Sequence, residues 1–286
     1  MGPIIRNVIR DVIRPVMGDE ALVSRFSGLL DLYPGAAVAY SLARLSASTT
    51  NVVRVRRSSD DAEQDFTAEQ VADGTLTAFC GSSDGWVRTL YDQSGNNRHG
   101  HKITASGQLK IVAAGSLITM GGVPVIERTT TSQEIDVLYD LRNISNASLY
   151  LTHNTSSSTG GLLNSYDPDR NNNDFLGLWQ EGSTSELINS SIGTPTIYTN
   201  GSAFTDTTRD DMHAALATGN DLLVSAVEFN TAAEDYANGI NVWRYRQLPT
   251  ISFTSLGKLG DFILFDNSNN RADIEAEIAG RYGITI

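Results

Sequence analysis

The chain has 286 residues, a formal net charge of −12 at pH 7 and a single cysteine, Cys80. The negative balance argues against nucleic acid and anionic membrane surfaces as partners, and a lone thiol excludes both an intrachain disulfide and a zinc site built on several cysteines. No apolar run reaches 18 residues, so the sequence predicts no membrane-spanning helix.

Residues 1–18 repeat a four-residue unit in which an isoleucine is followed by an arginine. A period of four places the isoleucines on one helical face and the arginines on another. The segment is too short for a stable free helix, and three arginines against one aspartate give it a charge of +2. We predict a helical anchor that docks on a partner, with a frayed terminus or docking on the protein's own domain as alternatives. The proposed anchoring residues are Ile5, Arg6, Ile9, Arg10, Ile13 and Arg14.

Residues 19–35 are predicted to form a connecting helix. Acidic residues begin it, apolar residues recur at helical spacing, and Pro34-Gly35 ends it. The next stretch, AAVAYSLARLSAS at 36–48, is compatible with a second short helix.

Residues 36–286 are predicted to form one domain, in which short β-prone runs alternate with stretches rich in Gly, Ser, Asn and Asp. The runs are NVVRVRR (51–57), GWVRTLYD (85–92), GVPVIER (122–128), ASLYLTH (147–153), DFLGLWQ (174–180), DLLVSAVEFN (221–230), GINVWRYR (239–246) and GDFILFD (260–266). Many short strands without alternating helices predict an all-β, antiparallel β-sandwich.

The last predicted element is a helix. It can begin at an Asn269 or Asn270 cap, and Gly283 lies where it should end. Its apolar stripe consists of Ile274, Ile278 and Tyr282. We expect this stripe to pack on the sandwich and shield a sheet edge.

Four stretches resemble the concanavalin A-like, laminin-G-like domains of phage structural proteins. They are AVAYSLARL (37–45), VVRVRRSSDDAEQDF (52–66), LTAFCGSSDGWVRTLYDQSGNNRHGHK (76–102) and GDFILFDNSNNRADIEAEIAGRYGI (260–284). The resemblance implies a concanavalin-like jelly roll.

Residues 36–102 are also similar to the N-terminal half of the catalytic domain of the fungal α-L-arabinofuranosidase B family, whose YDQSG element is matched at 91–95. That similarity implies a retaining glycosidase with two carboxylates about 5 Å apart. The family's nucleophile lies in an Asn-Met-Glu-Thr type motif, which this sequence lacks. Its acid lies in a GDNSN run before the last strand, whereas DNSN at 266–269 follows the strand predicted at 260–265. Neither residue carries over, so we assign no catalytic residue.

The stretch YDQSGNNRHGH at 91–101 gathers aromatic, carboxylate, amide and imidazole groups, as a sugar site requires. Tyr91, Asp92 and Gln93 are therefore candidate carbohydrate-binding residues. The alternative, which the turn chemistry favours, is a structural turn closed by Asp92 with Tyr91 packed inward. His99 and His101 form only an incomplete metal site.

The stretch YDPDRNNND at 166–174 places Asp167, Asp169 and Asn171 at alternate positions, a spacing that can wrap a calcium ion. Calcium is the one candidate cofactor. A solvated loop that uses Asp and Asn for turns is the favoured alternative. Tyr166 and Trp179 flank the loop and could stack on a sugar.

We therefore predict a non-enzymatic bacteriophage virion protein, whether capsid decoration, head fibre or tail-associated. Its anchor would bind copies of itself or other virion proteins, and a homo-oligomer is expected. Its lectin-like sandwich would face the virion exterior and bind polysaccharide. The alternatives are a glycoside hydrolase with displaced acids and a free, extracellular bacterial carbohydrate-binding module.

Overall fold

The protein is described from a computed structural model, which covers residues 27–130, 132–137, 146–155, 163–165, 196–205, 209–216, 218–229, 240–242, 257–267 and 269–286. Within these ranges, sixteen strands form one continuous hydrogen-bonded sheet and two more form a hairpin. The strand pairings are antiparallel, and the helices are short. The predicted all-β antiparallel sandwich is confirmed, while the predicted anchor at 1–18 lies outside the described residues.

The strands of the main sheet have the following bounds: β1 Ala36–Tyr40, β2 Val53–Arg57, β3 Glu63–Phe66, β4 Gly85–Leu90, β5 Gly100–His101, β6 Lys110–Ala113, β7 Ser116–Leu117, β10 Ile126–Arg128, β11 Ile135–Val137, β12 Ala147–Thr155, β13 Leu163–Ser165, β14 Thr196–Thr199, β15 Ser202–Ala203, β16 Leu222–Phe229, β17 Ile240–Val242 and β18 Gly257–Phe265. The hairpin is β8 Thr119–Met120 and β9 Val123–Pro124. The helices are α1 Leu29–Leu32, α2 Ala68–Ala72, α3 Thr75–Cys80, α4 Arg209–Leu216 and α5 Arg271–Tyr282, and Ala105–Gly107 is a 3₁₀ turn.

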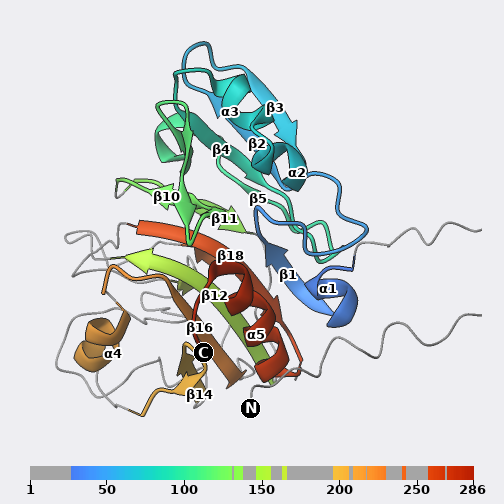
Figure 1. Ribbon diagram of the computed structural model, residues 1–286, viewed down its shortest axis with the longest axis vertical. Helices are drawn as coiled ribbons and strands as arrows, with labels where there is room; N and C mark the ends of the chain where they lie inside the picture. Colours follow the sequence, from blue (N-terminus) through green and yellow to red (C-terminus); the bar gives the residue numbers. More distant parts are fainter. Residues whose placement is uncertain are drawn as a thin grey trace, which may run out of the picture.

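Strand β18 lies at the centre of the sheet. One of its edges pairs with β12 along its whole length, and its other edge is shared by β10 and β1. Strands β16, β14 and β15 continue outward from β12. Figure 1 shows β18, β12 and β16 side by side in the lower half of the molecule, with β2, β3 and β4 in the upper half.

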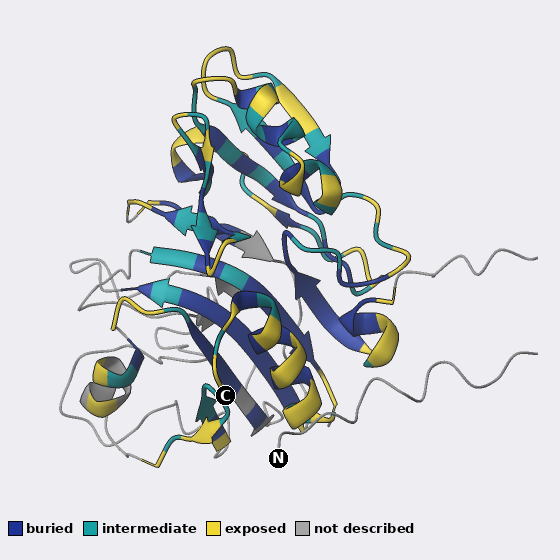
Figure 2. Cartoon of the chain, viewed as in Figure 1, coloured by how far each residue is buried: buried dark blue, intermediate teal, exposed yellow. Residues whose placement is uncertain are grey.

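The core has two parts because side chains alternate along a strand. Phe262 and Leu264 of β18 join the apolar cluster that also contains Val55 of β2. Ile263 and Phe265 point the other way and join a second cluster with the stripe of α5. Figure 2 shows the result: β18 and β12 are mostly buried, and α5 is buried only on the side that faces them.

Helix α5 has the predicted stripe and the predicted end, since Gly283 adopts φ 67° at its C-terminus. The helix is joined to the sheet through buried charge. Asp261 of β18 is 0% exposed, and it accepts hydrogen bonds from the Arg281 guanidinium and, at 2.9 Å, from the Tyr282 hydroxyl. Removing the partner of such a carboxylate would leave an uncompensated buried charge.

The helix predicted within 36–48 is wrong. Residues Ala36–Tyr40 form strand β1, which is buried along its full length and pairs with β18. An apolar run with no polar face carries no periodicity that could separate a strand from a helix, so distant pairing decides. In the described part of 19–35, the helix is Leu29–Leu32, and it ends before Pro34-Gly35.

Two helices between β3 and β4, α2 and α3, were not predicted. Helix α2 begins with a capping box, in which Thr67 and Gln70 each accept a hydrogen bond from the other's backbone N–H. That Thr-x-x-Gln spacing is visible in the sequence and could have revealed the helix. Cys80 at the end of α3 is buried, and burial raises the pKa of its thiol to about 11. No helix in the described ranges is long and apolar enough to cross a membrane.

Candidate functional site

Asp92 lies in the turn that follows β4, and its carboxylate holds that turn together. One oxygen accepts hydrogen bonds from the backbone N–H of Ala39 at 2.9 Å and of Ser94 at 3.0 Å. The other accepts from the Ser94 hydroxyl at 2.7 Å and from the Arg98 backbone N–H at 3.0 Å. A carboxylate can accept about four hydrogen bonds, so donors of the protein itself fill the acceptor positions of Asp92.

The neighbouring Gln93 is occupied in the same way. Its side-chain oxygen accepts from the backbone N–H of Leu45 at 2.7 Å and from the Thr49 hydroxyl at 3.1 Å. Its amide nitrogen donates to the carbonyl oxygens of Ser41 at 2.8 Å and Ala43 at 2.9 Å. Gln93 thereby fixes the chain that leaves β1, including the start of the stretch 48–51.

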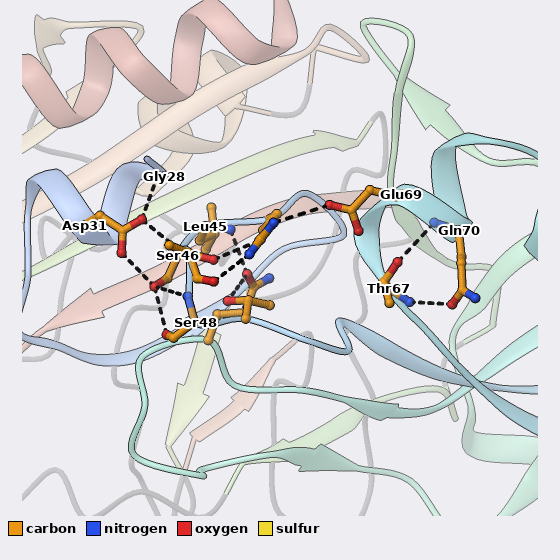
Figure 3. A network of polar contacts seen from close by, with 12 residues as sticks. Gly28, Asp31, Leu45, Ser46, Ser48, Thr67, Glu69 and Gln70 are labelled. Carbon is orange, nitrogen blue, oxygen red and sulfur yellow. Dashed lines mark hydrogen bonds and ion pairs between the residues drawn. The ribbon is translucent and has the colours of Figure 1, made fainter. Parts of the chain in front are cut away.

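The residues just before this stretch are held by Asp31 of α1. The Asp31 carboxylate accepts from the backbone N–H groups of Gly28 at 2.8 Å and Ala47 at 2.7 Å, and from the Ser46 hydroxyl at 2.8 Å. The hydroxyls of Ser46 and Ser48 lie 3.0 Å apart. Figure 3 shows this network around Ser46. The hydrogen bond from Gly28 is the main reason that the pKa of Asp31 is lowered.

Tyr91 is fixed by an ion pair behind it. Its hydroxyl donates to Asp65 at 2.7 Å, and Asp65 accepts two hydrogen bonds from Arg54 at 2.7 and 3.0 Å. Desolvation, followed by the Asp65 hydrogen bond, raises the pKa of Tyr91 to about 12. The ring meets that of His99 edge to face, with centroids 5.0 Å apart. Tyr91 is therefore a rigid aromatic wall rather than an acid.

One ring nitrogen of His99 is engaged in a hydrogen bond. Its Nδ1 accepts a hydrogen bond from the backbone N–H of Asp92 at 3.0 Å. An uncharged ring that accepts at Nδ1 carries its proton on Nε2, so the other side of the ring is a donor.

These elements enclose a cleft of about 290 Å³ beside the turn. Its lining residues are Ser48, Thr49, Thr50, Asn51, Tyr91, Asp92, Gln93, Gly95, Asn97 and His99. Hydroxyl, amide and aromatic groups dominate the lining. The volume lies just below the ~300–1,000 Å³ of typical small-molecule sites, so the cleft suits one compact polar ligand.

The structure brings the candidates Tyr91, Asp92 and Gln93 together at this cleft, and it also shows that Asp92 and Gln93 use their polar atoms within the protein. Contact of these residues with a sugar stays a prediction. The other candidates lie outside the described residues; they are Tyr166, Asp167, Asp169, Asn171 and Trp179.

The sequence analysis missed the second wall of the cleft, at 48–51, and Asn97. The signal was present as SASTTN at 46–51, a dense run of hydroxyl and amide side chains. Asn97 has φ 57°, a left-handed conformation that asparagine tolerates better than most residues.

His99 and His101 are neighbours in the structure. Their rings lie 6.1 Å apart, and Nδ1 of His101 is hydrogen-bonded to the Thr89 hydroxyl at 3.0 Å. No group of three or more His, Cys, Asp or Glu side chains among the described residues is placed to hold a metal ion.

Comparison with known proteins gives matches in structure only. No protein-family model matches the chain, and no curated protein matches its sequence. Among solved structures, the chain is similar to an arabinofuranosidase complexed with arabinofuranosyl-α-1,2-xylobiose, with a TM-score of 0.49 and 11% identity over 85% of this chain and 62% of that one. It is similar to the same extent, with 12% identity, to a GH54 α-L-arabinofuranosidase soaked with a cyclic sulfate inhibitor. The chain thus spans 62% of the length of each.

Proposed function

We propose that this protein is a glycan-binding β-sandwich that holds a carbohydrate without hydrolysing it. The observation that carries the proposal is the polar cleft between the turn at 91–99 and the stretch at 48–51. Sugar sites combine a fixed ring face with hydroxyl and amide groups that pair with sugar hydroxyls, and this cleft has both.

The rigidity of the cleft supports a binding role. Gln93 holds Thr49 in one wall, Asp31 holds Ala47 just before that wall, and Asp65 holds the Tyr91 hydroxyl. Walls that are fixed before a ligand arrives reduce the entropy lost on binding.

Hydrolysis at this cleft is disfavoured by its carboxylate count. A retaining glycosidase needs two carboxylates about 5 Å apart, one of them free to attack the sugar. Among the described lining residues Asp92 is the only carboxylate, and its oxygens already accept four hydrogen bonds. Asp92 therefore has no free oxygen lone pair with which to attack the sugar or to accept a proton.

We also propose that the protein is displayed on a phage particle. The repeated Ile-Arg units at 1–18 suit a contact with copies of the chain or with an acidic groove on another virion protein, which would display the sandwich on a phage surface. The resemblance of the sequence to phage structural domains supports this setting.

Glycoside hydrolysis is the second candidate function, because the solved structures named above are arabinofuranosidases. A free, extracellular carbohydrate-binding module is the third.

Titration of the full chain with a set of oligosaccharides tests the proposed function. The variant Thr50→Trp fills the cleft from an exposed position, and Ser59→Trp, on the turn between β2 and β3, is its matched control. We expect Thr50→Trp to lose glycan affinity at an unchanged melting temperature and Ser59→Trp to retain it. Equal affinity in both variants would rule out this cleft as the site.

A further inference from the structure

We propose that the cleft accepts an uncharged sugar residue and discriminates against uronic acids and amino sugars. This inference rests on the proposed function, because it names the class of glycan for the same site. It follows from the contacts of the one carboxylate in the lining and of the Arg54–Asp65 ion pair behind it.

The hydrogen-bonding capacity of the one carboxylate in the lining is already filled. All four hydrogen bonds to Asp92 come from groups of the protein, and three of the donors are backbone N–H groups. Asp92 is only 9% exposed. An ammonium group in the cleft would therefore find no acceptor on Asp92 unless the turn itself opened.

The charged groups behind the cleft are engaged within the protein. Arg54 donates two hydrogen bonds to Asp65, which also accepts one from the Tyr91 hydroxyl. The Arg98 guanidinium donates to the carbonyl oxygen of Ala37 at 2.7 Å. The charge of Arg54 is thus already neutralised by Asp65, and the Arg98 guanidinium is directed at the backbone of β1.

The orientation of His99 is fixed by the backbone. Its Nδ1 accepts a hydrogen bond from the backbone N–H of Asp92, which leaves Nε2 as the ring nitrogen for a ligand. Nε2 thus adds one polar atom beside the Tyr91 ring.

Three lining side chains keep their hydrogen-bonding capacity: Thr50, Asn51 and Asn97 make no side-chain hydrogen bond to any described residue. One hydroxyl and two amides both donate and accept, as sugar hydroxyls do. A neutral sugar can thus exchange its water contacts for protein contacts. A charged group that leaves water here finds no oppositely charged group with free hydrogen-bonding capacity among the described lining residues, and that loss is costly.

The first test compares pairs of related oligosaccharides whose members have the same sugar backbone and differ in charge. One pair is N,N′,N″-triacetylchitotriose and the cationic chitotriose, and the other is methyl-esterified trigalacturonate and the free acid. We expect the neutral member of each pair to bind at least about tenfold more tightly, because burying a charged group without a free partner of opposite charge is costly. Equal or tighter binding of the charged members would overturn the inference and leave the proposed function standing. Failure of these and all other oligosaccharides to bind would overturn both.

The second test moves a charge into the cleft. Thr50→Arg should reverse the preference within the trigalacturonate pair, and Thr50→Glu should reverse it within the chitotriose pair. Ser59→Arg, at the far end of β2, supplies the same charge outside the cleft and should change neither preference. Folding is checked by the melting temperature. If folded Thr50→Arg and Thr50→Glu keep the wild-type preferences, the discrimination does not arise in this cleft and the inference is wrong.

Discussion

The Asp92 carboxylate accepts a 2.9 Å hydrogen bond from the backbone N–H of Ala39, a residue 53 positions earlier in the chain. The backbone N–H of Gln93 returns a hydrogen bond to the carbonyl oxygen of Ala39 at 2.8 Å. Strand β1 has β18 on one edge, and the turn after β4 satisfies Ala39 on the other. The turn thus takes the place of a further strand.

This role predicts that Asp92→Ala impairs folding. The substitution leaves several donors without their acceptor, and each buried unsatisfied group costs about 1–3 kcal/mol. We expect the free energy of unfolding, measured by urea denaturation, to fall by at least that amount. Asp73→Ala, which removes one exposed hydrogen bond to Thr75, is the control. An unchanged denaturation curve together with lost glycan binding would show that Asp92 is a ligand-binding residue instead.

Because neither catalytic carboxylate of the arabinofuranosidase B family carries over by position, and Asp92 is occupied, we predict that the protein does not hydrolyse arabinofuranosides. We expect no saturable release of 4-nitrophenol from 4-nitrophenyl α-L-arabinofuranoside at a protein concentration at which a GH54 arabinofuranosidase gives a measurable rate. Saturable hydrolysis that a single Glu→Gln or Asp→Asn substitution abolishes would establish the second candidate function and refute this prediction.

The contact between α5 and β18 predicts a strongly destabilised Arg281→Ala variant. Asp261 would keep the Tyr282 hydroxyl but lose its cation, and an unpaired buried charge costs about 3–5 kcal/mol. Adding Asp261→Asn removes that charge, so the double variant should be more stable than Arg281→Ala alone. A double-mutant cycle from thermal denaturation measures the coupling, and simple additivity would contradict the prediction.

Stability should fall in acid partly through Asp84. The Lys110 ammonium, 2.8 Å away, is the main cause that holds the pKa of Asp84 below its ordinary value of 3.8. A carboxyl with a lowered folded pKa binds a proton more readily in the unfolded chain, so its contribution is present above pH 3.8 and is lost as the pH falls through the folded pKa. Asp84→Asn should therefore be less stable than the wild type near neutral pH, and the difference should shrink toward pH 3. A difference that stays constant with pH would exclude this ion pair as the cause.

Deleting residues 1–18 should leave a folded sandwich with nearly unchanged thermal stability that no longer joins particles or oligomers. The segment is too short to be stable alone and needs a partner for its isoleucines. Light scattering and particle incorporation measure the loss. If the shortened chain unfolds, residues 1–18 belong to the core of the domain, and the anchoring proposal fails.

The sequence predicted the elements whose pattern is local. Strand β2, with alternating Val and Arg, and helix α5, with its stripe and glycine stop, were both found where expected. Strand β1 was taken for a helix because its partner lies near the other end of the chain.

The candidate site shows the same limit. The turn at 91–95 was visible as a polar cluster, but its opposite wall is placed by hydrogen bonds such as that from Thr49 to Gln93, 44 positions away. No periodic pattern in the sequence of either segment indicates that contact.

The central place of β18 has a consequence for biosynthesis. Ribosomes release a chain from its N-terminus onward, yet β1, β10 and β12 all pair with a strand that is translated after them. Their edges stay open until then, and sheets built from such distant pairings fold slowly. The nascent protein therefore passes through a stage with unpaired apolar strands, a stage at which chaperone binding competes with aggregation.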